Sequence, residues 1–272
     1  MNDHPPIPDY DRLPDLAERH VIVTGASRGI GLAIARALAE CRARVSLVSR
    51  TARDIESARA TLANAAEHAA FATDVTDAGA VDAMVEAAAA RLGPVFALVN
   101  NAGTGDAVAF VDGDDAHWRR MIDVNLMSAV FCTRAVLPGM IQRREGRVVN
   151  IASTAAIRGY RHVAAYSAAK HALLGLTRSL AREVERDGVL VRAVCPGYTE
   201  TDLLAESIRA ASRRTGKSEQ EIRARFESSN RGGRLVRTDE IAHAVAWLCG
   251  ERAVDLSGAG FVLDGGPPEV LD

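Results

Sequence analysis

The sequence predicts a doubly wound α/β domain with helices on both faces of a seven-stranded parallel sheet. Apolar, strand-like runs alternate with Ala-rich helical stretches along most of the 272 residues. The runs are apolar at consecutive positions, which indicates strands that are buried on both faces. A glycine-rich turn joins the first run to the first helical stretch, as is typical of this fold class. Since no linker-like segment divides the chain, one domain is expected.

The composition fits a soluble enzyme-sized domain and excludes several function classes. Hydrophobic residues make up 48% and charged residues 25%, and the net charge of −2 argues against a nucleic-acid partner. The apolar runs are shorter than a membrane span and the N-terminus lacks a signal pattern, so no membrane contact is expected. The four cysteines are scattered without a zinc-type pair, which predicts no metal site and fits the reducing cytoplasm.

The elements are predicted in chain order from these runs. Residues 1–18 are rich in Pro and Asp and are expected to form an irregular arm before the domain, which spans 19–272. Helices are predicted where Ala-rich stretches lack Pro, as at 30–40, 80–92 and 164–185. The seven predicted strands lie within 20–25, 44–49, 69–74, 96–101, 146–153, 190–197 and 258–266.

A charged helical segment at about 202–232 interrupts this alternation. It is inserted after the carboxyl end of the sixth predicted strand, at the edge where such sheets bind ligands. We therefore expect a lid over the substrate site. A pair of solvated surface helices is the alternative interpretation.

The turn after the first strand predicts a dinucleotide-binding site. Gly25, Gly29 and Gly31 stand in the segment VIVTGASRGIGLAIARAL, which runs from strand to helix. Glycines permit a tight turn and a close backbone approach, and the helix N-terminus then presents free N–H groups to a pyrophosphate. A glycine triplet alone is a weak signal, but its position at the first strand-to-helix junction makes it specific.

The end of the second strand predicts which dinucleotide binds. An acidic residue there would accept hydrogen bonds from the adenosine ribose and favour NAD(H). This strand ends instead in Ser49 and Arg50, and Arg28 lies in the glycine turn. The two guanidiniums can donate charge-assisted hydrogen bonds to a 2′-phosphate. NADP(H) is therefore expected rather than NAD(H).

Tyr166 and Lys170 form a candidate acid/base pair. They are four residues apart in the predicted helix 164–185, so they share a face, and Lys170 is one of only two lysines in the chain. A nearby ammonium stabilises phenolate and lowers the pKa of the phenol, which suits Tyr166 to general acid/base catalysis. Taken alone, such a pair is more often part of a solvated helix face.

Six short motifs along the chain support a catalytic role for Tyr166 and Lys170. Together they resemble the short-chain dehydrogenase/reductase family, and the resemblance extends from about residue 19 to residue 267. It implies a Rossmann fold and an oxidoreductase that interconverts ketones and secondary alcohols. The motifs are TGASRGIG (24–31), NNAG (100–103), DVNLMS (123–128), NIAS (150–153), YSAAK (166–170) and CPGYTETD (195–202).

The resemblance assigns four catalytic residues. It implies that Tyr166 transfers the proton, that Lys170 lowers its pKa and binds the nicotinamide ribose, and that Ser153 orients the carbonyl. Asn125 matches the residue that helps to hold a water-linked proton relay with Lys170. The chemistry is coherent, because hydride transfer places negative charge on oxygen and two hydroxyls are available to stabilise and protonate it.

The resemblance also implies an extended set of cofactor contacts. Asn100, the NIA segment and Pro196 equally fit a structural role at the sheet edge. The implied cofactor-binding residues are Gly25, Ser27, Arg28, Gly29, Ile30 and Gly31 in the turn, Ser49 and Arg50 after the second strand, Asp74 and Val75 at the adenine, Asn101, Ala102 and Gly103 beside the adenosine, Tyr166 and Lys170 at the ribose, and Pro196, Gly197, Thr199 and Thr201 at the nicotinamide.

The substrate is expected to be a small carbonyl compound or alcohol, with a 3-oxoacyl thioester favoured. The segment around the lid resembles 3-oxoacyl reductases and 3-hydroxyacyl-CoA dehydrogenases. Its cations could attract the phosphates of CoA or of a carrier-protein arm. Alternatively, Glu206, Glu219, Glu221 and Glu227 pair with them on a solvated face. Carrier docking is disfavoured by the acidic end of helix 164–185. The lid cations are Arg209, Arg213, Arg214, Lys217, Arg223 and Arg225.

Two further functional readings stay open. One is an NAD-dependent dehydrogenase of 3-hydroxyacyl-CoA or another secondary alcohol, and the other is a non-catalytic NADP-sensing protein on the same fold. The complete catalytic set favours an enzyme, since a sensor has no need of all four residues. The resemblance implies a homotetramer, with a homodimer as the alternative, and the apolar segments 123–141 and 166–180 support burial against another subunit.

Overall fold

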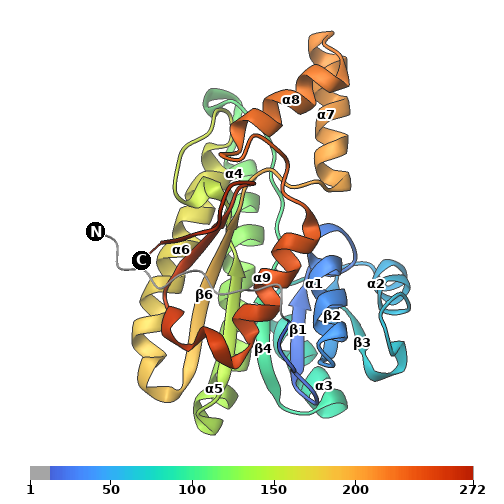
Figure 1. The fold of residues 1–272 in the computed structure, drawn as a ribbon, viewed down its shortest axis with the longest axis vertical. Helices are drawn as coiled ribbons and strands as arrows, with labels where there is room; N and C mark the ends of the chain where they lie inside the picture. Colours follow the sequence, from blue (N-terminus) through green and yellow to red (C-terminus); the bar gives the residue numbers. More distant parts are fainter. Residues whose placement is uncertain (1–12, 272) are drawn as a thin grey trace.

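Eight strands form one sheet in the computed structural model, which describes residues 13–271 (Figure 1). The order is β3-β2-β1-β4-β5-β6-β7-β8, and it reverses at β1, where such folds open a crevice for ligands. Of the predicted arm, only 13–18 lies within the described residues, and there Leu16 is buried in the core. The strands are β1 (His20–Thr24), β2 (Arg44–Ser49), β3 (Ala69–Ala72), β4 (Val95–Asn100), β5 (Gly146–Ile151), β6 (Val189–Pro196), β7 (Gly260–Leu263) and β8 (Glu269–Leu271).

The first seven strands are parallel, as predicted, and the eighth is an addition. β8 runs antiparallel to β7, with Gly260 opposite Leu271. The chain reverses through Gly265, whose φ of 80° lies in the left-handed region that glycine tolerates. A three-residue strand has too few positions to show a periodicity, so the sequence did not predict it.

Six of the nine α-helices among the described residues cover the two faces of the sheet, which confirms the doubly wound class. α1, α2 and α9 lie over one face, and α3, α5 and α6 over the other. The helices are α1 (Gly29–Glu40), α2 (Ala52–Arg59), α3 (Ala78–Leu92), α4 (Asp115–Ile122), α5 (Ser128–Arg143), α6 (Ala164–Val184), α7 (Asp202–Thr215), α8 (Glu219–Ser229) and α9 (Thr238–Cys249).

A π-helical turn, Asp123–Met127, joins α4 to α5 in one continuous stretch. Within the described residues, this stretch alone is long and apolar enough to cross a membrane. Its residues Met121, Cys132 and Met140 are buried in the protein, as in the core helix of a soluble domain. Other apolar side chains of α5, such as Phe131 and Leu137, pack against this core but are only half-buried.

The predicted lid segment forms the helix pair α7 and α8, which projects beyond the carboxyl edge of the sheet (Figure 1). The two helices are joined at Gly216, which has a φ of 70°. Their contact is a small apolar cluster of their own, built from Leu204 and Ile208 of α7, Ile222 of α8, and Leu235. The lid helices therefore pack on a separate apolar cluster and not on the apolar clusters that cover the two faces of the sheet.

Candidate active site

The glycine turn has the close backbone approach that the sequence predicts. Gly25 and Gly29 have φ values of 65° and 56°, a region that disfavours residues with a Cβ. A Cβ on Gly31 would lie 2.3 Å from the carbonyl oxygen of Gly25, so no other residue fits there. Ser27 is half-buried in the turn, and Arg28 precedes the first turn of α1, in which Ile30 lies. The free N–H groups of this turn form a cradle for a phosphate.

Thr24 and Asn101 hold the glycine turn in place. The Asn101 side-chain amide donates to the carbonyl oxygens of Thr24 at 2.9 Å and Gly25 at 3.2 Å. The backbone N–H groups of Asn101 and Ala102 both donate to the Thr24 hydroxyl at 3.0 Å. Asn101, predicted as a cofactor contact, thus uses its side chain to join β4 to β1. Thr24 was missed, although it opens the TGASRGIG motif.

The end of β2 carries an unpartnered hydroxyl, on Ser49, and a cation, Arg50, while Arg28 lies in the glycine turn. Ser49 Oγ is buried without a hydrogen-bond partner in the described structure. Arg28 and Arg50 are exposed, and within residues 13–271 neither has a carboxylate within ion-pair distance. Hydrogen bonds from Thr76, and to a smaller extent the charge of Arg50, lower the pKa of Asp74. An unused hydroxyl at the end of β2, followed by Arg50, with Arg28 in the glycine turn, fits a phosphorylated ribose.

The adenine side of the site is formed by the segment after β3. Val75, predicted as an adenine contact, is buried at 7% exposure. Asp74 next to it accepts hydrogen bonds from the backbone N–H and the hydroxyl of Thr76, at 3.0 and 2.7 Å. The carboxylate of Asp74 is therefore already engaged in a local turn.

The loop after β6 brings Thr201 next to the glycine turn. Its methyl group would lie 3.6 Å from a Cβ on Gly29, so two segments that are far apart in sequence face each other. Pro196 ends β6, and the Thr199 hydroxyl donates to the Gly197 carbonyl at 2.9 Å. These positions match the nicotinamide side of the predicted site.

Asn230 supports this loop and was missed in the sequence. Its Oδ1 accepts from the backbone N–H of Tyr198 at 2.8 Å, and its Nδ2 donates to the carbonyls of Tyr198 and Arg234 at 2.9 and 2.7 Å. A Cβ on Gly197 would lie 2.4 Å from Asn230 Oδ1. The end of the lid is thereby fastened to the start of the nicotinamide loop.

Three of the four predicted catalytic residues meet at the carboxyl edge of β5. Ser153 follows β5, while Tyr166 and Lys170 lie on α6. The Ser153 and Tyr166 hydroxyls share a hydrogen bond. Lys170 Nζ lies 5.7 Å from the centre of the Tyr166 ring and donates to the Ile151 carbonyl at 2.8 Å. The structure thus brings two hydroxyls close to a buried ammonium.

Burial governs the protonation of this cluster. It raises the pKa of the Tyr166 phenol above its ordinary value, and the hydrogen bond with Ser153 only partly opposes this rise. It also lowers the pKa of Lys170 to about 8, since the ammonium is removed from water. The net shift in the pKa of Tyr166 is therefore opposite to the one expected from Lys170 alone, whose own contribution stays a prediction. The phenol is held protonated, ready to donate.

Asn125 lies in the π-helical turn and faces the loop after β4. A π turn leaves a helical carbonyl without its usual partner, and Asn125 Nδ2 donates to that of Met121 at 3.0 Å. Its amide also forms a pair of hydrogen bonds with the backbone of Thr104, at 3.1 and 2.9 Å. A Cβ on Gly103 would lie 2.9 Å from Asn125 Oδ1 and 3.6 Å from Lys170 Nζ. Gly103 therefore separates these two predicted relay residues.

A chain of buried amides and hydroxyls lies beneath the catalytic edge. Asn100 of β4 donates to Asn150 of β5 at 2.9 Å and to Thr133 at 3.0 Å. Asn150 donates in turn to Thr177 of α6 at 2.9 Å. This network supports the structural interpretation of Asn100 and the NIA segment, because it ties two strands to the helices above them.

Aromatic rings connect the catalytic loop to the lid. Tyr160, seven residues after Ser153, packs edge-on against Tyr198 at 5.8 Å, and Tyr198 packs against Phe226 of α8 at 4.7 Å. The Arg158 guanidinium donates to the Tyr160 hydroxyl at 2.7 Å and to the Ser229 carbonyl at 3.2 Å. Both Tyr198 and Tyr160 are close enough to Tyr166 to contribute to the rise in its pKa.

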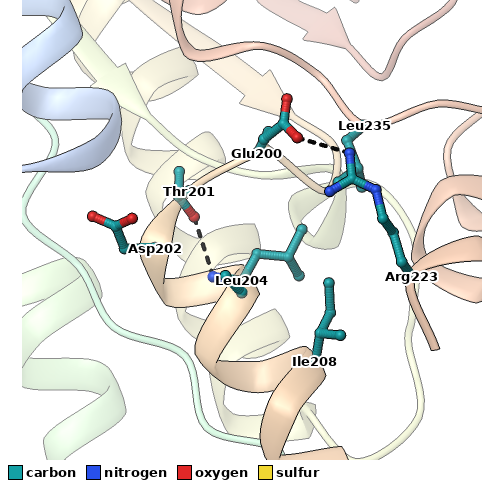
Figure 2. Close-up of a pocket in the computed structure, with 8 residues that line it drawn as sticks. Glu200, Thr201, Asp202, Leu204, Ile208, Arg223 and Leu235 are labelled. Carbon is teal, nitrogen blue, oxygen red and sulfur yellow. Dashed lines mark hydrogen bonds and ion pairs between the residues drawn. The ribbon is translucent and has the colours of Figure 1, made fainter. Parts of the chain in front are cut away.

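A cavity of about 220 Å³ opens beside α7, with an apolar floor and a charged rim (Figure 2). An ion pair of 2.7 Å between Glu200 and Arg223 closes one side. None of the four catalytic residues lines it. The lining residues are Glu200, Thr201, Asp202, Leu204, Ala205, Ile208, Arg223 and Leu235.

Comparisons with known proteins agree with this geometry. The short chain dehydrogenase family matches residues 19–212. The 3-oxoacyl-(acyl-carrier-protein) reductase of Escherichia coli is 37% identical over 246 residues, which cover 90% of this chain and 95% of that protein.

Two solved structures share the fold over nearly their whole length. A variant of the actinorhodin polyketide ketoreductase, crystallised with NADPH, has a TM-score of 0.87 and 35% identity, covering 94% of this chain and 98% of the other. The L-sorbose reductase of Gluconobacter frateurii, complexed with NADPH and L-sorbose, has a TM-score of 0.86 and 29% identity, covering 92% and 96%.

Proposed function

The chain belongs to the short-chain dehydrogenase family and is an oxidoreductase of ketones and secondary alcohols, and we propose that it reduces 3-oxoacyl thioesters with NADPH. The observation that carries this proposal is the cluster of Ser153, Tyr166 and Lys170, which the loop 101–104 joins to the glycine turn. The relatives support it, because they include a 3-oxoacyl reductase and two reductases that were solved with NADPH.

NADPH would supply a hydride to the carbonyl carbon, and the residues of this chain manage the charge that develops on oxygen. The hydroxyls of Ser153 and Tyr166 already share a hydrogen bond, so both can turn toward one substrate oxygen. Tyr166 donates its proton to that oxygen, and its raised pKa keeps the proton in place until then. Ser153 orients the carbonyl and stabilises the oxyanion.

Lys170 acts after the proton has left. A phenolate on Tyr166 is stabilised by the neighbouring ammonium, which is fixed by the Ile151 carbonyl. Lys170 would also bind the nicotinamide ribose. Asn125 holds the loop that carries Gly103, and we propose that it supports a water-linked path by which the proton is replaced.

Ser49, Arg28 and Arg50 would hold the 2′-phosphate that distinguishes NADPH. The buried, unpartnered Ser49 hydroxyl supports this assignment, since such a group is costly without a partner. The glycine turn would hold the pyrophosphate, and Thr201 and Thr199 the nicotinamide side.

The test is NADPH oxidation, measured at the nicotinamide absorbance band, with the N-acetylcysteamine thioester of acetoacetate as substrate. We expect turnover that requires both NADPH and the thioester. A non-catalytic NADP sensor would bind NADPH without consuming it in the presence of this thioester or of a simple 1,3-diketone. Faster reaction with NADH would favour the NAD-dependent alternative.

We further propose a cytoplasmic homotetramer, with a homodimer as the alternative. Apolar side chains of α5 that pack against the core but keep part of their surface exposed, among them Phe131 and Leu137, support burial against a second copy. Light scattering across micromolar concentrations should give a mass of several subunits. A monomer throughout that range would contradict the proposal.

A further inference from the structure

The far end of the lid carries four cations, Arg209, Arg213, Arg214 and Lys217, which we call the distal lid cations. The segment 207–218 contains these four and no Asp or Glu, in a chain whose net charge is −2. All four side chains are exposed. A local charge of this sign on a slightly acidic protein favours an anionic partner.

The carboxylates of the lid do not neutralise this group. Arg223 takes Glu227 and Glu200 as its ion-pair partners, at 2.8 and 2.7 Å. Glu221 is engaged by Ser218 in the cap of α8, and the more distant charge of Lys217 only helps to lower its pKa. Within the described part of the chain, no carboxylate lies within ion-pair distance of a distal lid cation.

Helix electrostatics explain only part of the cluster. Arg213 and Arg214 lie in the last turn of α7, where cations favourably meet the helix dipole. Arg209 lies in the middle of α7, and Lys217 lies beyond Gly216, outside the helix. The alternative interpretation, a solvated face of paired charges, therefore fits Arg223 with Glu227 but not the distal lid cations.

One exposed face of α7 leads from the nicotinamide loop to the distal lid cations. α7 begins directly after Thr201, and its buried side packs against α8. Leu203 is 46% exposed near the start, and Ser207, Ala210 and Arg214 follow it at helical spacing, all exposed. At 1.5 Å per residue, Leu203 and Arg214 are about 16 Å apart along the helix.

We propose that the distal lid cations bind the phosphates of an acyl-CoA substrate whose acyl group reaches Tyr166. This inference rests on the proposed function. CoA carries a pyrophosphate and a further phosphate at the far end of a long, flexible arm, so its charges lie well away from the reacting thioester. The exposed face of α7 has that length and ends in cations.

The shape and charges of the lid disfavour an acidic carrier protein as the partner of the distal lid cations. The distal lid cations lie on a narrow projection of two helices, next to exposed Glu206 and Glu219. A broad acidic surface would meet these carboxylates, whereas separate phosphate groups can avoid them. Phosphates on a flexible arm therefore fit the site better.

The experiment compares two thioesters of acetoacetate, one on CoA and one on N-acetylcysteamine, which has no phosphate. The wild type should show a kcat/KM about tenfold higher for the CoA thioester, from several exposed ion pairs of ordinary strength. A fourfold variant should abolish that preference by raising KM for the CoA thioester, and it should leave the reaction of the N-acetylcysteamine thioester unchanged. Its changes are Arg209→Gln, Arg213→Gln, Arg214→Gln and Lys217→Gln. Added salt should erode the wild-type preference.

A matched control removes the same charge elsewhere. The control pair is Arg182→Gln with Arg186→Gln, two exposed residues in the last turn of α6 and just after it, and it should leave the CoA preference intact. Arg213→Gln with Arg214→Gln should reduce that preference. A preference that survives the fourfold variant, or is equally lost in the control pair, would overturn the proposal.

The outcomes separate this inference from the proposed function. Wild-type turnover of the N-acetylcysteamine thioester without a CoA preference would overturn the phosphate site alone. Failure with both thioesters would overturn the proposed function. A strong preference for acetoacetyl groups on an acyl carrier protein over CoA would replace the proposal by a protein partner.

Discussion

The catalytic edge and the lid are held in place by different physical means. Asn125 and Lys170 are 1% and 4% exposed, and they lie on helices that pack against the sheet. The lid helices share only a small apolar cluster, which includes Leu204 and Ile222, and their outer surface is charged. The residues that we propose for proton transfer thus lie on buried core elements, while the segment proposed to select the substrate lies outside the core. The predictions below test this division, from the largest effect to the smallest.

Removal of the Tyr166 hydroxyl should have the largest effect. Tyr166→Phe keeps the ring packing and loses only the proton donor, so kcat should fall by about 10²–10⁴-fold. NADPH affinity, measured by fluorescence titration, should stay nearly constant. Activity within a few-fold of the wild type would show that Tyr166 is not the proton donor. The proposed division between a catalytic edge and a substrate-selecting lid would then be wrong.

The cofactor preference should be the next largest effect. Charge-assisted bonds from Arg28 and Arg50 should favour NADPH over NADH by about tenfold to a thousandfold. The double change Ser49→Asp with Arg50→Ala should reverse this, because a carboxylate repels the phosphate and accepts from the ribose hydroxyls. Dissociation constants for both cofactors decide the matter, with Arg53→Ala on α2 as the control. Equal wild-type affinities would contradict the assignment.

Lys170→Arg should lower activity by about a hundredfold, although it preserves the charge. The side chain is enclosed, and a planar guanidinium cannot keep the contact of 2.8 Å with the Ile151 carbonyl. Since burial lowers the pKa of Lys170 to about 8, the wild type should lose the ammonium, and with it activity, above that pH. In kcat/KM profiles this alkaline fall should be absent from Lys170→Arg. A wild-type rate and profile in the variant would make Lys170 an ordinary cation.

The smallest effect should come from Arg158, which connects the loop after Ser153 to the end of the lid. Arg158→Gln removes the bonds to the Tyr160 hydroxyl and the Ser229 carbonyl, so KM should rise by about fivefold while kcat changes less. Arg161→Gln, an exposed neighbour on the same loop, should change neither parameter. If kcat fell as much as KM rose, the lid and the catalytic edge would form one unit rather than two.

The fold class could be predicted from the sequence and is confirmed by the structure, while the catalytic set stays a prediction whose members Ser153, Tyr166 and Lys170 the structure brings together. Strands and helices were identified from their apolar periodicity, and the glycine turn from its spacing. The antiparallel β8, the supporting residues Thr24 and Asn230, and the fastening role of the Asn101 side chain were not predicted. They depend on which distant segments meet, for example residue 101 with residues 24 and 25, and spacing along the chain carries no such information.

The sequence by itself determined the chemistry that is available, because the identity and helical spacing of Tyr166 and Lys170 are local properties. Only the tertiary structure decided the energies of their charged forms. Packing buries both groups, and that desolvation raises the pKa of Tyr166 against the direction that the pair alone suggests. Desolvation depends on all the atoms that the fold collects around a group, whereas a short motif names only two of them.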